Sequence, residues 1–577
     1  MLLYYLLVER RLYFSLQFFN TMGIPSYFSH ILHSYAKIIH NYASIVKDRV
    51  KFTRLYMDCN SILYDVYRST DTTLPVQEFY TSIIHSAAKK IDMYIRQIRP
   101  NDVIFIAFDG VAPMAKMDQQ RTRRYKSWFE KAVHNAIDPP KTTVENEKTT
   151  CIFTPGTVFM NQLSQYMKSH FRNKEHEYCV RSIYVATPDE PGEGEHKLYA
   201  HMRENPHQSP EETSAVYGLD ADLLMLSLLH LPVCPSLYVF REAPQFGSVT
   251  KTLLEDSVKP DEPLFLDIAK MARSIVSSMK CSTMHDHKRL QDYVFICFFL
   301  GNDFLPHFPS MNIRTHGIEV LLEVYRQEIA NKNNAYLLAS NEHGEPKIQW
   351  KQLSRFVKGL AKCEQEWLHQ EYTVREKWSK RPVQLQRKST PTEKIELFTN
   401  TPVLNRAVEL AINPYEKGWQ MRYYQLLFPP KVSILNVCQS YLEGLQWVTQ
   451  YYTVGKVNWN WTYQYDYPPL LQDLAPKIPH YETEFLPFTQ DTHPVHHYTQ
   501  LCYVLPPVYH FLLPVSIQNY LRIQHSKYYV GPINEDGLPQ LDFQWAFCRY
   551  FWECHVHLPN IPITTIQEWE RVVTGFN

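Results

Sequence analysis

The sequence has neither the cysteine spacing nor the charge excess that marks several common protein classes. Its eleven cysteines include no C-x-x-C pair, which argues against a zinc ribbon and against a secreted disulfide framework. Lys and Arg number 59, and Asp and Glu also number 59, so the formal net charge is zero. Proteins that hold nucleic acid through bulk electrostatics are normally basic. Any nucleic-acid binding here must therefore come from acids and bases that are segregated into separate patches.

The sequence also has no apolar run that approaches the roughly 20 residues needed to cross a bilayer. The first 21 residues are apolar, but Glu9, Arg10 and Arg11 interrupt them. They also lack the order of a signal peptide, in which basic residues precede the apolar stretch and small residues mark a cleavage site. We interpret residues 1–21 as an upstream extension ahead of a natural start at Met22. We expect an intracellular protein, cytoplasmic in the first instance, with the nucleus as the alternative.

A chain of 577 residues is too long for one compact core, so we expect two or more packed lobes. The sequence suggests a first block at residues 22–330, a linker region at 331–394, and a second block at 395–577 that is rich in proline and aromatic residues. Residues 138–155 and 375–394 have the composition of loops. For the second loop we favour a solvated linker over an RNA contact. This loop includes the basic residues Arg375, Lys377, Lys380, Arg381, Arg387 and Lys388.

Between about residues 50 and 310, apolar runs alternate with helical patterns. The runs at 54–57, 103–108, 182–186 and 215–217 are each followed by a helical pattern. This alternation predicts an α/β fold with a parallel sheet. Acidic residues lie just past the carboxyl end of each run, which is where open α/β sheets bind their ligands.

Seven carboxylates occur in five short segments of this kind. Hard divalent cations such as Mg²⁺ prefer oxygen ligands, and a pair of such ions can promote phosphodiester cleavage. A single acid after a strand is more often a helix N-cap, but five such placements in one half of the chain are hard to explain by capping alone. The seven are Asp58, Asp109, Glu193, Glu195, Asp220, Asp222 and Asp303.

A basic stripe follows Asp109 directly in the chain. Lys116, Gln120, Arg123 and Arg124 are spaced i, i+4, i+7 and i+8, which is one face of a helix that Pro113 can begin. Arg can donate two hydrogen bonds to phosphate oxygens and Lys acts as a point charge, so the stripe is suited to bind a phosphate. A solvated basic face is the alternative, and the residues alone leave the two interpretations evenly balanced.

Two further patterns favour packing over chemistry. The segment Cys554-His555-Val556-His557 resembles a metal cluster, but we interpret it as part of an aromatic-rich packed segment. In the second block, five aromatic residues recur with period two, so an extended chain would place them on one face. We expect at least three of the five to be buried. They are Trp459, Trp461, Tyr463, Tyr465 and Tyr467.

Several long contiguous motifs occur in order along the chain. In the first block they are MGIPSYF (22–28), LYMDCNSIL (55–63), DGVAPMAKMDQQRTRR (109–124), TPGTVFM (154–160), PGEGEHK (191–197), YGLDADLLML (217–226) and FFLGNDFLPHFP (298–309). In the second block they are GWQMRYY (418–424), SYLEGLQWV (440–448) and NWNWTYQYDYPPL (458–470). Together these motifs resemble the 5′→3′ exoribonucleases of RNA turnover. The resemblance covers roughly residues 22–470, and the remainder more loosely.

The resemblance implies a flap-nuclease-like (PIN-like) catalytic domain with a largely helical, aromatic-rich second block packed on it. It implies two Mg²⁺ ions, or Mn²⁺ in their place, held by the seven acids. The 5′-monophosphate of a single-stranded RNA would lie against Lys116, Gln120, Arg123 and Arg124. The second block would enclose the site, so that only a single-stranded 5′ end enters and nucleoside 5′-monophosphates leave. We expect a monomer.

The sequence departs from the family pattern at named positions. Tyr64 stands where the family often has a histidine that stacks on a base, and Met114 stands where it often has an arginine. The family tryptophan that is thought to stack on the terminal base matches Trp459 or Trp461. The chain has neither the long C-terminal extension of the cytoplasmic branch nor the zinc knuckle of some nuclear members, as expected of a shortened catalytic core.

Two other functions remain open at this stage. A flap-type 5′ DNA nuclease would use the same acids, but it usually carries a helix-hairpin-helix with glycine pairs, which this sequence lacks. A non-catalytic RNA-binding scaffold would be expected to have lost some of the seven acids, and all seven are present.

Overall fold

The computed structural model describes residue 24 and residues 26–139, 147–218, 220–242, 262–281, 286–342, 344–380, 390–456, 458–486, 492–530 and 538–575. The expected upstream extension and the start at Met22 lie outside these residues. Among the described helices, none combines the length and the apolar character needed to cross a membrane.

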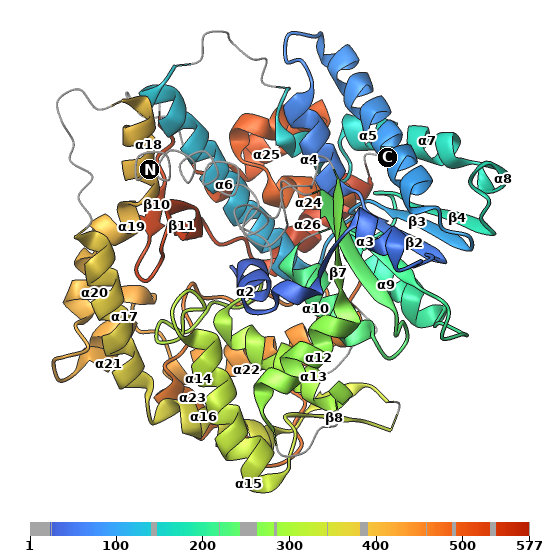
Figure 1. The fold of residues 1–577 in the computed structure, drawn as a ribbon. Helices are drawn as coiled ribbons and strands as arrows, with labels where there is room; N and C mark the ends of the chain where they lie inside the picture. Colours follow the sequence, from blue (N-terminus) through green and yellow to red (C-terminus); the bar gives the residue numbers. More distant parts are fainter. Residues whose placement is uncertain are drawn as a thin grey trace.

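A seven-stranded sheet forms the centre of the first block (Figure 1). Its strand order is β1-β7-β6-β5-β2-β3-β4. The five strands from β6 to β4 are parallel, and β7 and β1 add to one edge in antiparallel pairs. The bounds are β1 Ile39–Asn41, β2 Arg54–Asp58, β3 Val103–Ala107, β4 Ser182–Ala186, β5 Ser214–Tyr217, β6 Leu237–Glu242 and β7 Pro263–Asp267.

Helices cover both faces of this sheet, because alternate residues of each buried strand point to opposite sides. On β2, Leu55 and Met57 join one apolar cluster, whereas Tyr56 joins the other. The first cluster includes residues of α4 (Asn60–Ser69), α5 (Val76–Ile98) and α7 (Val158–Phe171). The second includes residues of α2 (Tyr27–Ser34), α9 (Gly194–Glu204), α10 (Ala221–His230), α12 (Ile268–Met279) and α13 (Asp286–Cys297). The predicted α/β class is confirmed.

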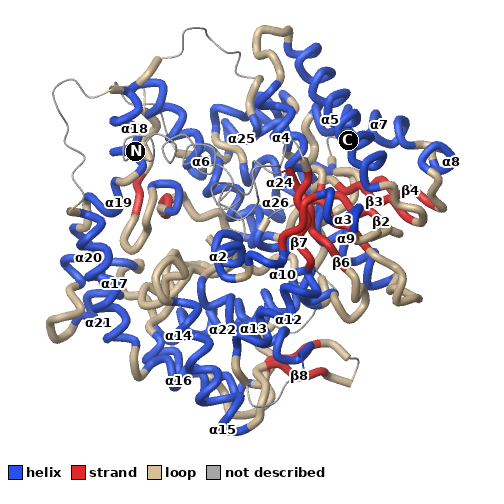
Figure 2. The backbone as a smooth tube through the Cα atoms, in the orientation of Figure 1, coloured by secondary structure: helices blue, strands red, loops and turns tan. Residues whose placement is uncertain are grey.

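The second block is largely helical and aromatic-rich, as the sequence predicts. Figure 2 shows the strands of the large sheet gathered in one half of the molecule, whereas the rest consists mainly of helices and loops with a few short strands. The helices from residue 317 onward are α14 (Gly317–Tyr325), α15 (Asn331–Asn333), α16 (Trp350–Ala361), α17 (Glu364–Ser379), α18 (Pro391–Thr399), α19 (Thr401–Leu404), α20 (Ala407–Ile412), α21 (Trp419–Leu427), α22 (Ile434–Thr453), α23 (Leu471–Leu474), α24 (His497–Val504), α25 (Val515–Gln524) and α26 (Ile563–Thr574).

The two blocks share one hydrophobic core. Helix α22 is buried along most of its length, and its residues Leu445 and Val448 belong to the same apolar cluster as Leu223 of α10 and Val216 of β5. Helix α6 (Met114–Ile137) also links the blocks, because it packs against α24 and α18 of the second block (Figure 1). The second block is therefore in direct contact with α6 and α10, two helices of the first block.

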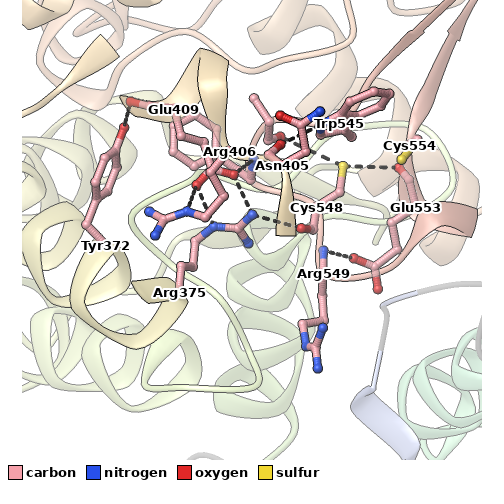
Figure 3. Close-up of polar contacts among 12 residues, drawn as sticks. Tyr372, Arg375, Asn405, Arg406, Glu409, Trp545, Cys548, Arg549, Glu553 and Cys554 are labelled. Atoms are coloured by element: carbon pink, nitrogen blue, oxygen red, sulfur yellow. Dashed lines mark hydrogen bonds and ion pairs between the residues drawn. The ribbon is translucent and has the colours of Figure 1, made fainter. Parts of the chain in front are cut away.

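The expected loop at 375–394 is wrong at its beginning. Residues 375–379 continue helix α17, and α18 begins at Pro391. Arg375 is only 2% exposed. Its Nε donates to Glu409 Oε2 at 2.9 Å, and Arg406 Nε donates to the same oxygen at 2.6 Å (Figure 3). Arg375 is thus committed to a buried ion cluster rather than to RNA. Of the other basic residues, Arg381, Arg387 and Lys388 lie outside the described residues.

The expected linker region at 331–394 also carries regular structure. It contains all of α15, α16 and α17, and a hairpin of β8 (Leu338–Ser340) and β9 (Pro346–Ile348). In the other expected loop, residues 150–153 form a 3-10 helix whose Ile152 and Phe153 are buried. Buried apolar side chains therefore pack parts of both segments, 331–394 and 138–155, against the core.

The Cys554 segment is packed, as we interpreted it. Cys554 is fully buried beside Cys548 and Phe551. The next three residues form β11 (His555–His557), which pairs with β10 (Asp542–Gln544). Among the described residues, the Cys, His, Asp and Glu side chains grouped closely enough to hold a metal ion are Glu193, Glu195 and His196, so this segment is not among them.

Candidate active site

Five chain segments bring carboxylates to the carboxyl edge of the parallel sheet. Asp58 is the last residue of β2, and Asp109 follows β3 by two residues. Glu193 and Asp220 immediately precede α9 and α10 in extended conformation. Asp303 follows the short 3-10 helix at 298–300. Parallel strands end at the same edge, which is why acids so far apart in sequence can meet.

Capping does not account for the acids that precede α9 and α10. Glu193 and Asp220 occupy the N-cap positions, yet neither side chain accepts a hydrogen bond from its own helix. An N-cap acid normally accepts from the second or third backbone N–H of the helix. Neither carboxylate therefore acts as a helix N-cap, which is the usual role of a single acid after a strand.

The acids lie close enough to perturb one another. Burial, followed by the charges of Asp109 and Asp220, raises the pKa of Asp58 well above its ordinary value. Burial, followed by the charge of Asp303, raises the pKa of Asp222 to about 8. Glu195 also has a pKa raised well above normal, by burial and then by Asp222 and Glu193. Carboxylates that repel one another in this way are typical of sites built to receive cations.

Specific contacts orient Asp109, whereas one oxygen of Asp58 lacks a hydrogen-bond partner among the described residues. The backbone N–H of Gly194 donates to Asp109 Oδ1 at 2.7 Å, and Asn60 Nδ2 donates to Asp109 Oδ2. Asp58 Oδ1 is buried and has no hydrogen-bond partner among the described residues. A Cβ at Gly194 would lie 2.8 Å from that same oxygen. Gly194 therefore lets the start of α9 approach both aspartates.

His196 joins this site, although the sequence reasoning did not single it out. One ligand atom each of Glu193, Glu195 and His196 lie within 4.8 Å of one another. Burial, followed by the charges of Arg203 and Lys116, lowers the pKa of His196 well below its ordinary value, so the ring stays neutral. Its position directly after Glu195 in PGEGEHK was the available signal.

Lys116, the first residue of the basic stripe, makes its contacts with the acids. Its Nζ is 2.7 Å from Glu193 Oε1 and 2.8 Å from Asp303 Oδ2, and its side chain is 6% exposed. Burial lowers the pKa of Lys116, but the charges of Asp303 and Glu193 outweigh burial and raise it well above normal. All four residues of the stripe lie on the single helix α6, as their spacing requires. The spacing could not show that the first turn of α6 enters the acidic cluster.

The later turns of α6 contact the second block and still lie near one of the acids, because the charge of Arg123 acts on Asp220. Gln120 Oε1 accepts a hydrogen bond from Gln500 Nε2 at 3.2 Å, so the second block contacts this part of the stripe. Arg123 and Arg124 are half-buried. Arg124 Nη1 is buried and lacks a hydrogen-bond partner within the described residues. Burial lowers the pKa of Arg124, and the neighbouring Cys151 and Tyr64 oppose that effect.

The three candidate stacking residues differ in their surroundings. Tyr64 is half-buried, packs edge-on against Phe153 with ring centroids 5.1 Å apart, and lies near Arg124. Trp459 is half-buried and lines a small apolar pocket with Met114 and Met117. Its carbonyl accepts from the N–H of Met114 at 2.9 Å.

Trp461 is a correction to the expected set. It is 6% exposed, and its ring stacks on Trp447 with centroids 5.3 Å apart. A ring packed in this way has no free face of the kind that base stacking needs. Trp461, Tyr463 and Tyr467 are all buried, which confirms that at least three of the five aromatic residues pack internally. Trp459 remains the stacking candidate of the pair.

Two tyrosines of α22 reach the acids and were also missed. The Tyr451 hydroxyl donates to Glu193 Oε2, and the Tyr452 hydroxyl donates to Asp222 Oδ1 at 2.5 Å. Both side chains are buried, at 5% and 2% exposure. Their signal in the sequence was a pair of tyrosines at the end of a helix, and such a pair is usually part of a core.

Comparison with known proteins agrees with this geometry. Residues 22–243 match the model for the XRN 5′-3′ exonuclease N-terminus, and residues 283–409 and 402–565 match the Xrn1 helical domain. A 5′-3′ exoribonuclease 2 of Arabidopsis thaliana is 26% identical over 552 residues, covering 74% of this chain and 54% of its own. A human 5′-3′ exoribonuclease 1 is 27% identical over 606 residues, covering 94% of this chain and 33% of its own.

A solved structure of the catalytic core of Rad2 with a DNA substrate matches at 13% identity, covering 75% of this chain and 99% of that one. Its TM-score of 0.30 is too low for the match to bear on the fold. This chain spans about half the length of the Arabidopsis relative and a third of the human one. Because the two domain models cover both blocks, and the acids of the first block meet helices of the second in one core, the chain belongs to the XRN family of 5′-3′ exonucleases.

Proposed function

We propose that this protein is a 5′→3′ exoribonuclease that hydrolyses single-stranded, 5′-monophosphorylated RNA to nucleoside 5′-monophosphates. The observation that carries the proposal is the joint placement of seven carboxylates and two arginines around α6. Asp109 leads into this helix, and Arg124 lies near its middle with a guanidinium nitrogen that has no partner among the described residues. A buried donor without a partner is costly, and an anionic ligand would satisfy it.

The acidic residues fit divalent cations. Asp58 Oδ1 is a buried oxygen that lacks a hydrogen-bond partner within the described part of the chain, so it is suited to coordinate a cation. The donor set is almost entirely carboxylate oxygen, which suits Mg²⁺, and Mn²⁺ tolerates the added imidazole of His196. Two ions, when bound, would activate a water and stabilise the leaving oxygen. The residues that would hold them are Asp58, Asp109, Glu193, Glu195, Asp220, Asp222 and Asp303.

The proposed 5′-phosphate pocket lies on the face of α6 that the sequence indicates. Arg123 and Arg124 are its arginines, and Gln120 lies one turn away, held by Gln500. Lys116 is placed between the pocket and the acids, where its ammonium offsets the charge of Glu193 and Asp303. We assign to Lys116 the task of lowering repulsion near the scissile phosphate. The two arginines bind the terminal phosphate itself.

Confinement by the second block supports an exonuclease over an endonuclease. Gln500 of α24 contacts α6 next to the proposed pocket, and Trp459 lies against Met114 at the start of the same helix. Helix α22 reaches the acids from that block as well. A site bordered on these sides accommodates a chain end more readily than the middle of a duplex. We propose that the partner is single-stranded RNA, that the protein acts as a monomer, and that it works in the cytoplasm.

The experiment that tests the proposal compares end-labelled RNAs that differ only at the 5′ end. Matched 5′-phosphate, 5′-hydroxyl and capped RNAs, a circular RNA and a flap DNA are incubated with Mg²⁺ or with EDTA. We expect stepwise release of mononucleotides from the 5′-phosphate RNA alone, and only with Mg²⁺. Cleavage of the circle would indicate an endonuclease, cleavage of the flap DNA would indicate a DNA nuclease, and inertness towards all substrates would indicate a binding protein.

A further inference from the structure

Two neighbouring tyrosines of the second block make direct hydrogen bonds to two acids of the first. Tyr451 donates to Glu193, which lies 258 residues earlier, and Tyr452 donates to Asp222, which lies 230 residues earlier. Glu193 and Asp222 are 5% and 4% exposed. The hydroxyls therefore cannot be exchanged for bulk water without opening the interface between the blocks.

The ring of Tyr451 is held by other aromatic groups. Its ring centroid lies 3.7 Å from that of His196. The ring stacks on Trp447 with centroids 4.8 Å apart and an interplanar angle of 20°, and it packs edge-on against Phe304 with centroids 5.1 Å apart. Tyr452 packs against Phe298 at 5.1 Å. Aromatic pairs of this kind have preferred geometries that resist rotation. Each hydroxyl is thus presented to its carboxylate in a fixed direction.

The two oxygens of Glu193 face different partners. Oε2 accepts from Tyr451, whereas Oε1 lies 2.7 Å from Lys116 Nζ, the ammonium that also contacts Asp303. The position of Lys116 shows which oxygen is turned towards a cation. Tyr451 therefore occupies the oxygen on the other side and fixes the rotation of the carboxylate. Tyr452 holds Oδ1 of Asp222 in the same manner.

We propose that Tyr451 and Tyr452 are positioning residues of the metal site, and that the second block thereby sets the geometry of the carboxylates in the first. This proposal rests on the proposed function only in that the acids bind a divalent cation. Hydrogen bonds from the shell around a metal ligand orient that ligand, and their loss typically costs about 10- to 100-fold in metal affinity or activity.

A purely structural role is the competing explanation, and α22 offers a matched control for it. Tyr441 lies on the same helix and is fully buried. Its hydroxyl has no hydrogen-bond partner among the described residues, and its ring packs against Phe308 and Tyr463 at 5.2 and 5.9 Å. Tyr441→Phe removes the same atom from the same helix without touching an acid.

The test compares Tyr451→Phe, Tyr452→Phe and Tyr441→Phe with the wild type in the full chain. Calorimetric titration measures Mn²⁺ affinity without substrate, and the melting temperature is recorded in EDTA and in Mg²⁺. Degradation of 5′-phosphate RNA is then followed across Mg²⁺ concentrations. We expect Mn²⁺ affinity to fall, and the Mg²⁺ concentration for half-maximal rate to rise, by about tenfold or more in the first two variants. The KM for RNA should stay within about twofold, since the phosphate pocket is untouched, and Tyr441→Phe should match the wild type.

Each outcome decides the proposal. If both variants bind Mn²⁺ as Tyr441→Phe does, the tyrosines do not position metal ligands, whatever the protein degrades. If the wild type binds Mn²⁺ but degrades no RNA, the proposed function fails, while the comparison of Mn²⁺ affinities still decides the role of the tyrosines. Loss of folded protein in one variant leaves the other to decide. Loss in both would assign the hydroxyls to folding and overturn the inference.

Discussion

Lys116 Nζ lies 2.7 Å from Glu193 Oε1, so the first residue of the basic stripe reaches into the acidic cluster. Replacing Lys116 with methionine keeps the length of the side chain but removes its charge. Breaking a buried pair from one side leaves the other charges uncompensated and costs about 3–5 kcal/mol. We therefore expect Lys116→Met to lower the melting temperature in EDTA and to increase the stabilisation gained on adding Mg²⁺. Equal stabilisation by Mg²⁺ in variant and wild type would show that Lys116 and the metal do not serve the same carboxylates.

Asp222→Ala tests the assignment of the acids. It removes one carboxylate of the cluster and leaves Arg123 and Arg124 in place, so turnover should fall while RNA binding remains measurable. A metal contributes several kcal/mol to phosphodiester cleavage, which corresponds to a hundredfold or more in rate, as an order of magnitude. Single-turnover degradation and filter binding measure the two effects. Asp542→Ala is the control, because the side chain of Asp542 is 82% exposed. Activity of Asp222→Ala within about tenfold of the wild type would contradict the metal assignment.

Arg124→Ala should weaken the preference for a 5′-phosphate and leave other properties intact. Charge-assisted hydrogen bonds contribute about 1.5–3 kcal/mol each, so the kcat/KM on 5′-phosphate RNA should fall by about ten- to a hundredfold. The kcat/KM on 5′-hydroxyl RNA should change little, because that substrate never uses the pocket. Lys89→Ala, an exposed change on α5, serves as the control. A uniform decrease on both RNAs would place Arg124 outside the phosphate pocket.

Gly194→Ala adds one methyl group between two acids. Its Cβ would lie 2.8 Å from Asp58 Oδ1 and 3.4 Å from Asp109 Oδ1, and the first distance is too short for carbon and oxygen. The start of α9 or the Asp58 side chain must shift, so we expect a strong loss of turnover and weaker Mn²⁺ binding. Gly575→Ala meets backbone oxygen only at 3.4 Å and provides the control. Mn²⁺ affinity equal to that of the wild type would show that the site tolerates the shift.

Glu409→Ala should destabilise the fold without altering the chemistry. It leaves Arg375 and Arg406 buried at 2% and 8% exposure without their shared carboxylate (Figure 3). Removing one partner of a buried ion cluster costs about 3–5 kcal/mol. Lys380→Ala breaks an ion pair whose lysine is 72% exposed, and such surface pairs contribute about 0–1 kcal/mol. Chemical unfolding curves of both variants measure the difference, and equal stability would assign the cluster no net role.

The sequence was most informative where the argument was local. Apolar runs that end at an acid predict that Asp58 and Asp109 share one sheet edge, because strand direction follows from the alternation of strand and helix. The period of α6 likewise predicts that Lys116 and Arg124 share a helical face. What lies opposite that face depends on packing between segments hundreds of residues apart. Packing of distant segments determines the partners of Lys116, the burial of Arg375 and the contact of Tyr451 with Glu193, so the sequence did not predict them.

The contact of α22 with the acids also bears on when the protein can become active during its own synthesis. All seven acids lie at or before residue 303, whereas the hydroxyls that hold two of them lie at residues 451 and 452. A nascent chain that has left the ribosome only as far as the sheet and its helices lacks these contacts. The full arrangement forms only after α22 has emerged and packed on α10. In a growing chain, Glu193 and Asp222 therefore lack these tyrosine contacts until synthesis has passed well beyond residue 452.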